Sequence, residues 1–152
     1  MIDLADLLTP ERVLLELRGG SKRQVLQTLS TAASEATGVD AEQILEALQQ
    51  REKLGTTGLG EGIAIPHAKI DELPALVGFF ARLAKPVDFD ALDDEPVDLV
   101  FLLLAPEEAG ADHLKALARI ARILRDPELC AALRRESDPR KVLELLCGRA
   151  GG

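Results

Sequence analysis

The sequence has little cysteine and little histidine, with two residues of each among 152. Cys130 and Cys147 both fall at apolar positions of predicted C-terminal helices, with neither CxxC spacing nor a histidine nearby. Cysteine outside disulfides is among the most often buried residue types, and metal or redox motifs need close ligand spacing. We therefore expect both cysteines to be reduced core residues. If the protein uses a histidine for chemistry, that residue is His67 or His113.

Long apolar runs are also missing. The longest, residues 99–105, stops at Pro106 and falls far short of the roughly 20 residues that span a bilayer. Asp3 and Asp6 stand where a signal peptide would carry positive charge. The sequence therefore predicts no direct membrane insertion and a cytoplasmic location.

Positive charge is in the minority. The net charge is −8, and the 18 Lys and Arg residues are spread along the chain instead of gathering in one stretch. Such a surface repels a phosphate backbone, so nucleic acid is not expected as a partner. The 47% apolar and 29% charged residues are typical of a globular protein. A domain of this length buries roughly 70% of the surface of its unfolded chain.

The apolar pattern predicts an alternation of strands and helices. Strands are expected over residues 13–17, 63–65, 77–83 and 97–105, and the last is too apolar to alternate, so it should be central and covered on both faces. Five residues suited to cap helix N-termini precede helical patterns: Ser21, Asp40, Asp112, Asp126 and Asp138. The order of strand, two helices, three strands and three helices predicts an α/β domain. We expect a single mixed β-sheet of about four to five strands flanked by helices.

His67 follows a change of pattern. Residues 58–62 read GLGEG and lead into the β-prone run 63–65, which Pro66 halts directly before His67. The end of such a strand is where a side chain can be exposed on a rigid support. A lone histidine is by default a surface or satisfied core residue, so position alone leaves both interpretations open.

The second histidine, His113, is expected in the first turn of a helix that Asp112 caps. The positive end of the helix dipole disfavours imidazolium there, and the unpaired backbone N–H groups favour an anion. A neutral imidazole at this position can donate a hydrogen bond to a phosphoryl oxygen. The alternative is an ordinary polar residue in a capped first turn.

A metal site is the rival interpretation of the two histidines. Together with Glu61 or Asp112 they would supply the ligands of a zinc site, but no short-range ligand motif supports one. Both acidic residues are more readily interpreted as solvated loop and cap residues. We therefore expect no metal.

The glycine-rich segment is not a nucleotide-binding motif. It lacks GxxxxGK[ST], contains no lysine, and does not match GxGxxG ahead of a helix. Arg51, at the end of the predicted second helix, can pair with a phosphate or simply with the helix dipole. Thr56 and Thr57 are similarly ambiguous between contact with a phosphate and a purely structural role.

Residues 54–69 read LGTTGLGEGIAIPHAK. This segment resembles the active-site signature of enzyme IIA proteins of the fructose, mannitol and nitrogen-regulatory class, which belong to the bacterial phosphoenolpyruvate-dependent phosphotransferase system. The resemblance continues through PVDFD at 86–90, PVDLVF at 96–101 and HL at 113–114. It covers essentially residues 1–147, which we expect to form one domain of this type, with residues 148–152 as a flexible C-terminal tail.

The resemblance implies that His67 is phosphorylated by the small histidine phosphocarrier protein of that system, and that His113 is the second active-site histidine. Arg51 falls on the family's arginine before the glycine-rich turn and Thr57 on its hydroxyl residue, so both are implied to support the phosphoryl group. Position 61 varies in the family, and Glu61 is given no role. A neutral imidazole is a competent nucleophile near pH 7, and its N–P bond is labile enough to pass the group onward. No cofactor is expected.

Three functions remain open on the sequence alone. The favoured one is a nitrogen-regulatory IIA component, expected from a domain that stands alone, which signals to regulatory target proteins by its phosphorylation state. The second is a fructose- or mannitol-type sugar-transport component that passes phosphate to a IIB domain. The third is a binding module that is never phosphorylated, against which the presence of both histidines argues. Because a carrier must admit a partner histidine, we expect an exposed apolar patch around His67.

Overall fold

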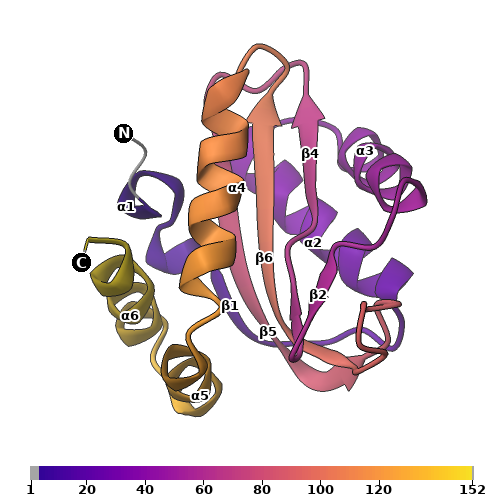
Figure 1. Cartoon of the computed structure of the whole chain (residues 1–152). Coiled ribbons are helices and arrows are strands. Elements are labelled where there is room, and N and C mark those ends of the chain that lie inside the picture. The colour runs from indigo at the N-terminus through magenta and orange to yellow at the C-terminus, as the bar shows by residue number, and fades with distance from the viewer. Residues whose placement is uncertain (1–3, 152) are drawn as a thin grey trace.

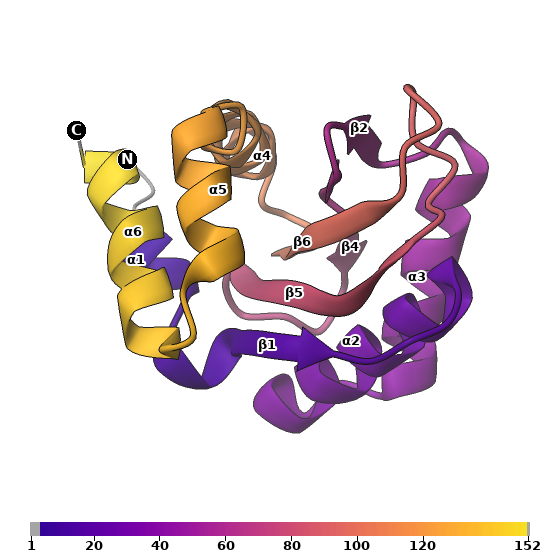
Figure 2. The same ribbon diagram turned by 90° about the horizontal axis from the view of Figure 1, so that it is seen from below.

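The computed structural model describes the backbone of residues 4–151 and the side chains of residues 4–148. A mixed sheet lies between two layers of helices (Figures 1 and 2). The strands are β1 (Val13–Leu17), β2 (Gly58–Gly60), β3 (Ile63–Ala64), β4 (His67–Ile70), β5 (Val77–Val87) and β6 (Val97–Pro106). The helices are α1 (Leu4–Leu7), the 3-10 turn η1 (Pro10–Arg12), α2 (Lys22–Thr37), α3 (Ala41–Lys53), α4 (Ala111–Ile123), α5 (Pro127–Arg135) and α6 (Pro139–Gly151).

The sheet has the order β1-β5-β6-β3-β2, and β4 also pairs with β6. Strand β1 is parallel to β5, β5 is antiparallel to β6, and both β3 and β4 run parallel to β6. The predicted α/β class and single mixed sheet are confirmed. The sheet has six strands, more than expected, because the glycine-rich segment pairs as β2 and the chain over residues 63–70 is interrupted between β3 and β4. Pro66 lies in that interruption, where it has no N–H to donate to the ladder.

Strand β6 is the centre of the molecule. All seven residues from Leu99 to Ala105 are 0% exposed. A strand covered on both faces needs no polar alternation, so the prediction of a central, doubly covered strand is confirmed.

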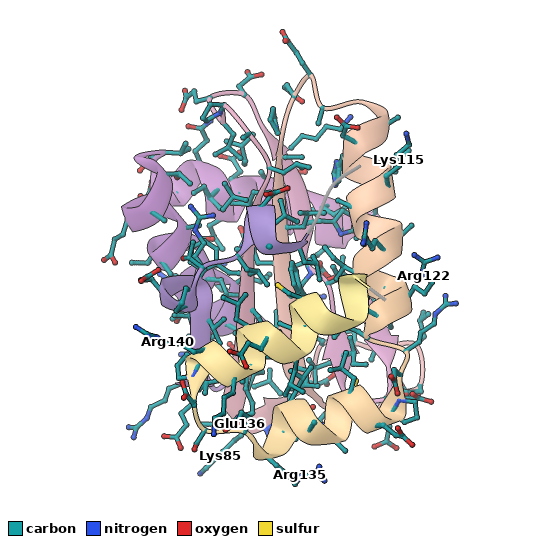
Figure 3. The ribbon with its side chains drawn as sticks, turned by 90° about the vertical axis from the view of Figure 1, so that its left-hand side faces the viewer. Lys85, Lys115, Arg122, Arg135, Glu136 and Arg140 are labelled. Carbon is teal, nitrogen blue, oxygen red and sulfur yellow. The ribbon has the colours of Figure 1, made fainter. Side chains whose placement is uncertain are left out.

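Two helical layers cover the sheet (Figure 2). Helices α2 and α3 supply apolar side chains to one core, and α1, α4, α5 and α6 supply them to the other. Helix α4 is amphipathic: Ala116 and Ile120 are buried against the sheet, whereas Lys115 and Arg122 extend away from it (Figure 3). The two faces of the sheet therefore meet different sets of helices, and β4 lies between α3 and α4 (Figures 1 and 2).

Three of the predicted caps are confirmed. The Ser21 hydroxyl accepts a hydrogen bond from the Gln24 backbone N–H at 3.2 Å. The carboxylates of Asp126 and Asp138 accept from backbone N–H groups of α5 and α6. Each cap satisfies an N–H that the helix leaves unpaired.

The other two predicted caps differ. Asp40 occupies the N-cap position of α3, but its side chain makes no capping hydrogen bond. The prediction for Asp112 is wrong, because α4 begins at Ala111 with Gly110 at the N-cap, and Asp112 lies inside the first turn. Gly110 has φ +56, a conformation that glycine adopts without steric cost.

The C-terminal helix α6 continues to Gly151 and so enters the segment 148–152. The domain boundary at residue 147 and the flexibility of the tail stay predictions, and Gly152 lies outside the described residues. Cys130 is buried and Cys147 partly buried, both as thiols. Within residues 4–151, no helix combines the length and the apolarity needed to cross a bilayer.

Candidate functional site

His67 is the first residue of β4, where the extended segment resumes after Pro66. It pairs with Leu103 in the buried part of β6. The sequence predicted a histidine on a rigid support after a strand, and the structure differs only in that the histidine opens the next strand. Its backbone is therefore fixed to the most buried strand of the molecule.

Arg134 holds the glycine-rich turn that precedes β3. Its guanidinium donates to both carboxylate oxygens of Asp98, at 2.8 and 2.9 Å, and to the Glu61 carbonyl at 2.9 Å. Gly62 has φ +84, and a Cβ there would lie 2.6 Å from Arg134 Nη2. Position 62 therefore requires glycine, and the segment leading to His67 is fixed at its start.

Both ring nitrogens of His67 have partners. Nδ1 lies 2.8 Å from the Ile65 carbonyl oxygen, which can only accept, so the ring proton is assigned to Nδ1. Nε2 then carries the lone pair, and it accepts a hydrogen bond from Nε of Arg51 at 3.1 Å. The nucleophilic nitrogen of the ring is thus Nε2.

The surroundings of His67 keep its ring neutral. Burial lowers the pKa of His67 below its ordinary value of 6.5, and the Arg51 guanidinium lowers it further. The hydrogen bond to the Ile65 carbonyl and the charge of Glu52 oppose this lowering of the pKa. Since the side chain is only partly buried, the structure presents a neutral imidazole that solvent and a partner can reach.

His113 lies beside His67. The two ring centroids are 5.7 Å apart and the planes meet at 76°. His113 is 6% exposed, and its Nε2 has no hydrogen-bond partner. Burial lowers the pKa of His113, helped by the nearby His67 and Lys69. The expected pairing of two imidazoles is present, and burial contributes more to the neutrality of His113 than the sequence suggested.

Arg51 comes from the last turn of α3 and reaches over the turn that follows. Its Nη1 donates to the Gly55 carbonyl at 2.9 Å while its Nε faces His67. A guanidinium has a planar fork of donors in fixed geometry. The two hydrogen bonds therefore fix the plane of the Arg51 fork at the rim of the His67 site.

Thr57 does not join this group. It is 3% exposed, and its hydroxyl donates to Oε2 of Glu52 at 2.5 Å while its backbone N–H donates to Oε1 at 3.1 Å. The structure thus brings together His67, His113 and Arg51. Thr57 contacts Glu52, a residue that the sequence did not single out.

A pocket of about 800 Å³ opens over these side chains. Its lining is Ala47, Gln50, Arg51, Leu54, His67, Ala68, Lys69, Gly110, His113 and Leu114. Leu54 and Leu114 are 84% and 68% exposed, among the few large apolar side chains left in solvent. An exposed apolar patch around His67 is confirmed, and its use for docking stays a prediction. Leu54 directly follows the end of α3, and Leu114 directly follows His113 in α4. The sequence did not single out either leucine as exposed.

The metal alternative gains no support from the geometry. Within residues 4–148, no group of three or more His, Cys, Asp and Glu side chains has an arrangement that could hold an ion. The backbone N–H of Glu61 is bonded to Asp93 at 2.8 Å, and Glu61 is not among the residues that line the pocket.

The neutral imidazole of His67 thus lies beside a second buried imidazole and an arginine, on a mixed sheet between helices. The chain matches the family "Phosphoenolpyruvate-dependent sugar phosphotransferase system, EIIA 2" over residues 6–147, and it belongs to that family. Among its relatives is a nitrogen regulatory protein of Bradyrhizobium diazoefficiens, 53% identical over 143 residues that make up 94% of each chain.

Two further comparisons link the chain to different branches of the family. The structure of the nitrogen regulatory protein IIA-Ntr from Neisseria meningitidis superposes with a TM-score of 0.90 and 33% identity, covering 94% of this chain and 98% of that one. A fructose-specific EIIA component of Haloferax volcanii is 37% identical over 149 residues, 95% of this chain and 97% of that protein. The chain is therefore similar to both regulatory and sugar-specific members.

Proposed function

We propose that this protein is a phosphocarrier of the nitrogen-regulatory type, in which Nε2 of His67 accepts a phosphoryl group from a histidine phosphocarrier protein. The observation that carries the proposal is the lone pair of Nε2 at the mouth of a pocket shared with Arg51 and His113. The similarity to nitrogen regulatory proteins over nearly the whole chain supports the branch.

The transfer is a direct displacement at phosphorus. The Nε2 lone pair forms the new N–P bond, and the electron pair of the broken N–P bond stays on the donor ring. The His67 ring becomes positively charged while the proton stays on Nδ1. The Ile65 carbonyl, which accepts that proton's hydrogen bond at 2.8 Å, stabilises the charge.

Arg51 and His113 act on the phosphoryl oxygens. The Arg51 N–H must leave the Nε2 lone pair when phosphorus takes it, and the oxygens then lie beside the guanidinium, which Gly55 still holds. His113 Nε2 is a buried polar atom with no partner, and such an atom is costly unless a ligand satisfies it. A neutral His113 that donates from Nε2 to a phosphoryl oxygen removes that cost. Preorganised donors of this kind stabilise the charge of a transition state.

This function implies partners and a location. The donor is a histidine phosphocarrier protein, and the phosphorylated and unphosphorylated forms bind different cytoplasmic target proteins. The protein acts stoichiometrically, because each phosphoryl group occupies its His67 until it is passed on.

The experiment is phosphorylation in vitro. Incubation with phosphoenolpyruvate, enzyme I and the phosphocarrier is expected to add the mass of one phosphoryl group, in an acid-labile form, to the wild-type protein. His67→Ala is expected to remain unmodified, and His113→Ala to be phosphorylated about 10²-fold more slowly with its fold intact. If cognate partners produce no mass increase, the protein is a binding module on a IIA fold.

The second candidate function is sugar transport, favoured by the similarity to the fructose-specific component. Its test uses the phosphorylated protein and isolated IIB domains of the fructose and mannitol types. Rapid loss of phosphate to a IIB domain would assign the protein to transport. Retention of phosphate in their presence supports the regulatory branch.

A further inference from the structure

Glu52 carries a largely buried carboxylate that the proposed phosphotransfer does not use. Its side chain is 9% exposed, and it accepts from three donors: Lys22 Nζ at 2.7 Å, the Thr57 backbone N–H at 3.1 Å and the Thr57 hydroxyl at 2.5 Å. A buried charge is costly unless it is paired and hydrogen-bonded. All the contacts of this carboxylate lead to two segments outside its own helix.

These contacts tie three parts of the chain together. Lys22 is the first residue of α2, Glu52 lies in the last turn of α3, and Thr57 ends the turn that leads into β2. Lys22 also lies over the Phe89 ring, with 5.5 Å between Nζ and the centroid. The Thr56 hydroxyl donates to the Phe89 carbonyl at 2.6 Å. The turn over residues 54–57 is therefore fixed by the hydroxyls of both its threonines: Thr56 bonds Phe89, and Thr57 bonds Glu52.

The held turn carries the atom that orients Arg51. The Gly55 carbonyl, in the middle of this turn, accepts from Arg51 Nη1 at 2.9 Å. Because the guanidinium is planar, fixing Nη1 fixes the direction of Nε, which lies 3.1 Å from His67 Nε2. A movement of Gly55 would turn the Arg51 fork away from the reacting nitrogen.

We propose that Glu52 is a positioning residue for phosphotransfer: by binding Thr57 and Lys22 it holds the Gly55 carbonyl in place, and through that carbonyl it sets the Arg51 guanidinium against His67 Nε2. The inference rests on the proposed function. It assigns the Thr57 hydroxyl to this anchor, acting on Arg51 through Glu52, and not to contact with the phosphoryl group.

The kinetic test compares Glu52→Gln with Glu46→Gln, a matched loss of one charge at an exposed position of the same helix. Misplacement by about 1 Å can cost roughly 10²-fold in rate, so we expect Glu52→Gln to lower kcat for phosphorylation by roughly 10- to 100-fold, with KM for the phosphocarrier changed less than about threefold. Glu46→Gln is expected to behave as wild type. In the Arg51→Ala background, Glu52→Gln should add nothing further, since non-additivity identifies residues that act through one another.

A second test does not depend on phosphotransfer. In the unphosphorylated protein, the ¹⁵N shift of His67 Nε2 reports its hydrogen bond from Arg51. Glu52→Gln should move this shift toward the value in Arg51→Ala, and Glu46→Gln should leave it unchanged. If the wild-type protein fails to accept phosphate, the proposed function fails, and this shift still decides whether Glu52 positions Arg51.

Two threonine variants keep the proposal testable if Glu52→Gln fails to fold. Thr57→Val removes one of the three hydrogen bonds and should lower kcat by roughly three- to tenfold, whereas Thr57→Ser should restore the wild-type rate. Wild-type kcat and an unchanged Nε2 shift in Glu52→Gln or Thr57→Val would overturn the proposal. The proposal would also be overturned if the losses of rate in Glu52→Gln and Arg51→Ala were additive in the double variant.

Discussion

Nε of Arg51 lies 3.1 Å from Nε2 of His67, so a guanidinium from the end of α3 donates to the lone pair of the first residue of β4. In the proposed phosphotransfer, Arg51 exchanges this hydrogen bond for contacts with the phosphoryl oxygens.

Arg51→Lys is expected to slow phosphorylation of His67 by about 10²-fold without unfolding the protein. Lysine has a single ammonium group on a flexible stem and cannot bond Gly55 and face Nε2 at once. Rapid-quench measurement of phosphoprotein formation checks this. Arg23→Lys, at an exposed position of α2, is the control, and a rate for Arg51→Lys within twofold of it would contradict the assigned role.

Both histidines are expected to titrate below pH 6.5, because burial lowers the pKa of each from that value. Ring-proton NMR shifts of His67 and His113, followed against pH, measure the two midpoints directly. A midpoint at or above 6.5 for either ring would mean that the imidazole is better solvated, or better paired as a cation, than the structure shows.

The same lowered pKa values couple stability to pH. Below pH 6.5 the unfolded chain binds protons that the folded protein does not, so the free energy of unfolding should fall as the pH drops from about 6.5 through the folded pKa values, and stay level above. Urea unfolding at a series of pH values gives the slope. His113→Gln should show a shallower slope; an equal slope would assign the effect to other groups.

Gly62→Ala is expected to destabilise the protein by about 1–3 kcal/mol. The residue has φ +84, and the new methyl group would meet Arg134 and Asp98 at 2.6 and 2.7 Å. Urea unfolding followed by circular dichroism measures the change. The control is Gly148→Ala in α6, where the added Cβ meets nothing within 4 Å apart from its chain neighbours and the nearby backbone of its own helix. Alanine there should stabilise the helix by roughly 0.5–1 kcal/mol.

Leu114→Glu is expected to raise KM for the phosphocarrier by roughly tenfold while leaving the melting temperature nearly unchanged, because an exposed apolar anchor at an interface contributes mainly to binding. Leu114 is 68% exposed at the rim of the pocket. Leu92, 77% exposed and outside that pocket, offers the matched control Leu92→Glu. Equal KM values for the two variants would place the docking surface elsewhere.

Sequence patterns predicted the long elements well and the short ones poorly. The strands at residues 13–17 and 97–105 follow from their apolar composition, and the caps at Ser21 and Asp126 follow from local chemistry. The β-prone run 63–65 did predict β3. Strands β2 and β4, of three and four residues, were not predicted, because strands this short form where a partner strand is available and no local pattern specifies them. The Asp112 cap was wrong because Gly110, with positive φ, is the N-cap of α4, two residues before the polar side chain that the sequence suggested.

The candidate site likewise has features that the sequence predicted and features that only the structure shows. The motif around residue 67 and its resemblance to a known family predicted that His67, His113 and Arg51 would meet, although they come from three separate elements. The hydrogen-bond partner of Thr57 was not predictable from the sequence. The same threonine at the same position could direct its hydroxyl to Glu52 or to a ligand, and only the structure distinguishes the two. The exposure of Leu54 and Leu114 depends on which helix faces the sheet leaves uncovered, which only the packed structure defines.

The parallel pairing of β1 with β5 has a consequence for how the chain is made. Val13 lies opposite Phe80, with α2, α3 and the whole glycine-rich segment between them in sequence. Such distant contacts slow folding because a long loop must close first. During synthesis, the first strand must therefore wait for its neighbour to leave the ribosome, and the His67 segment emerges before the sheet that will support it has closed.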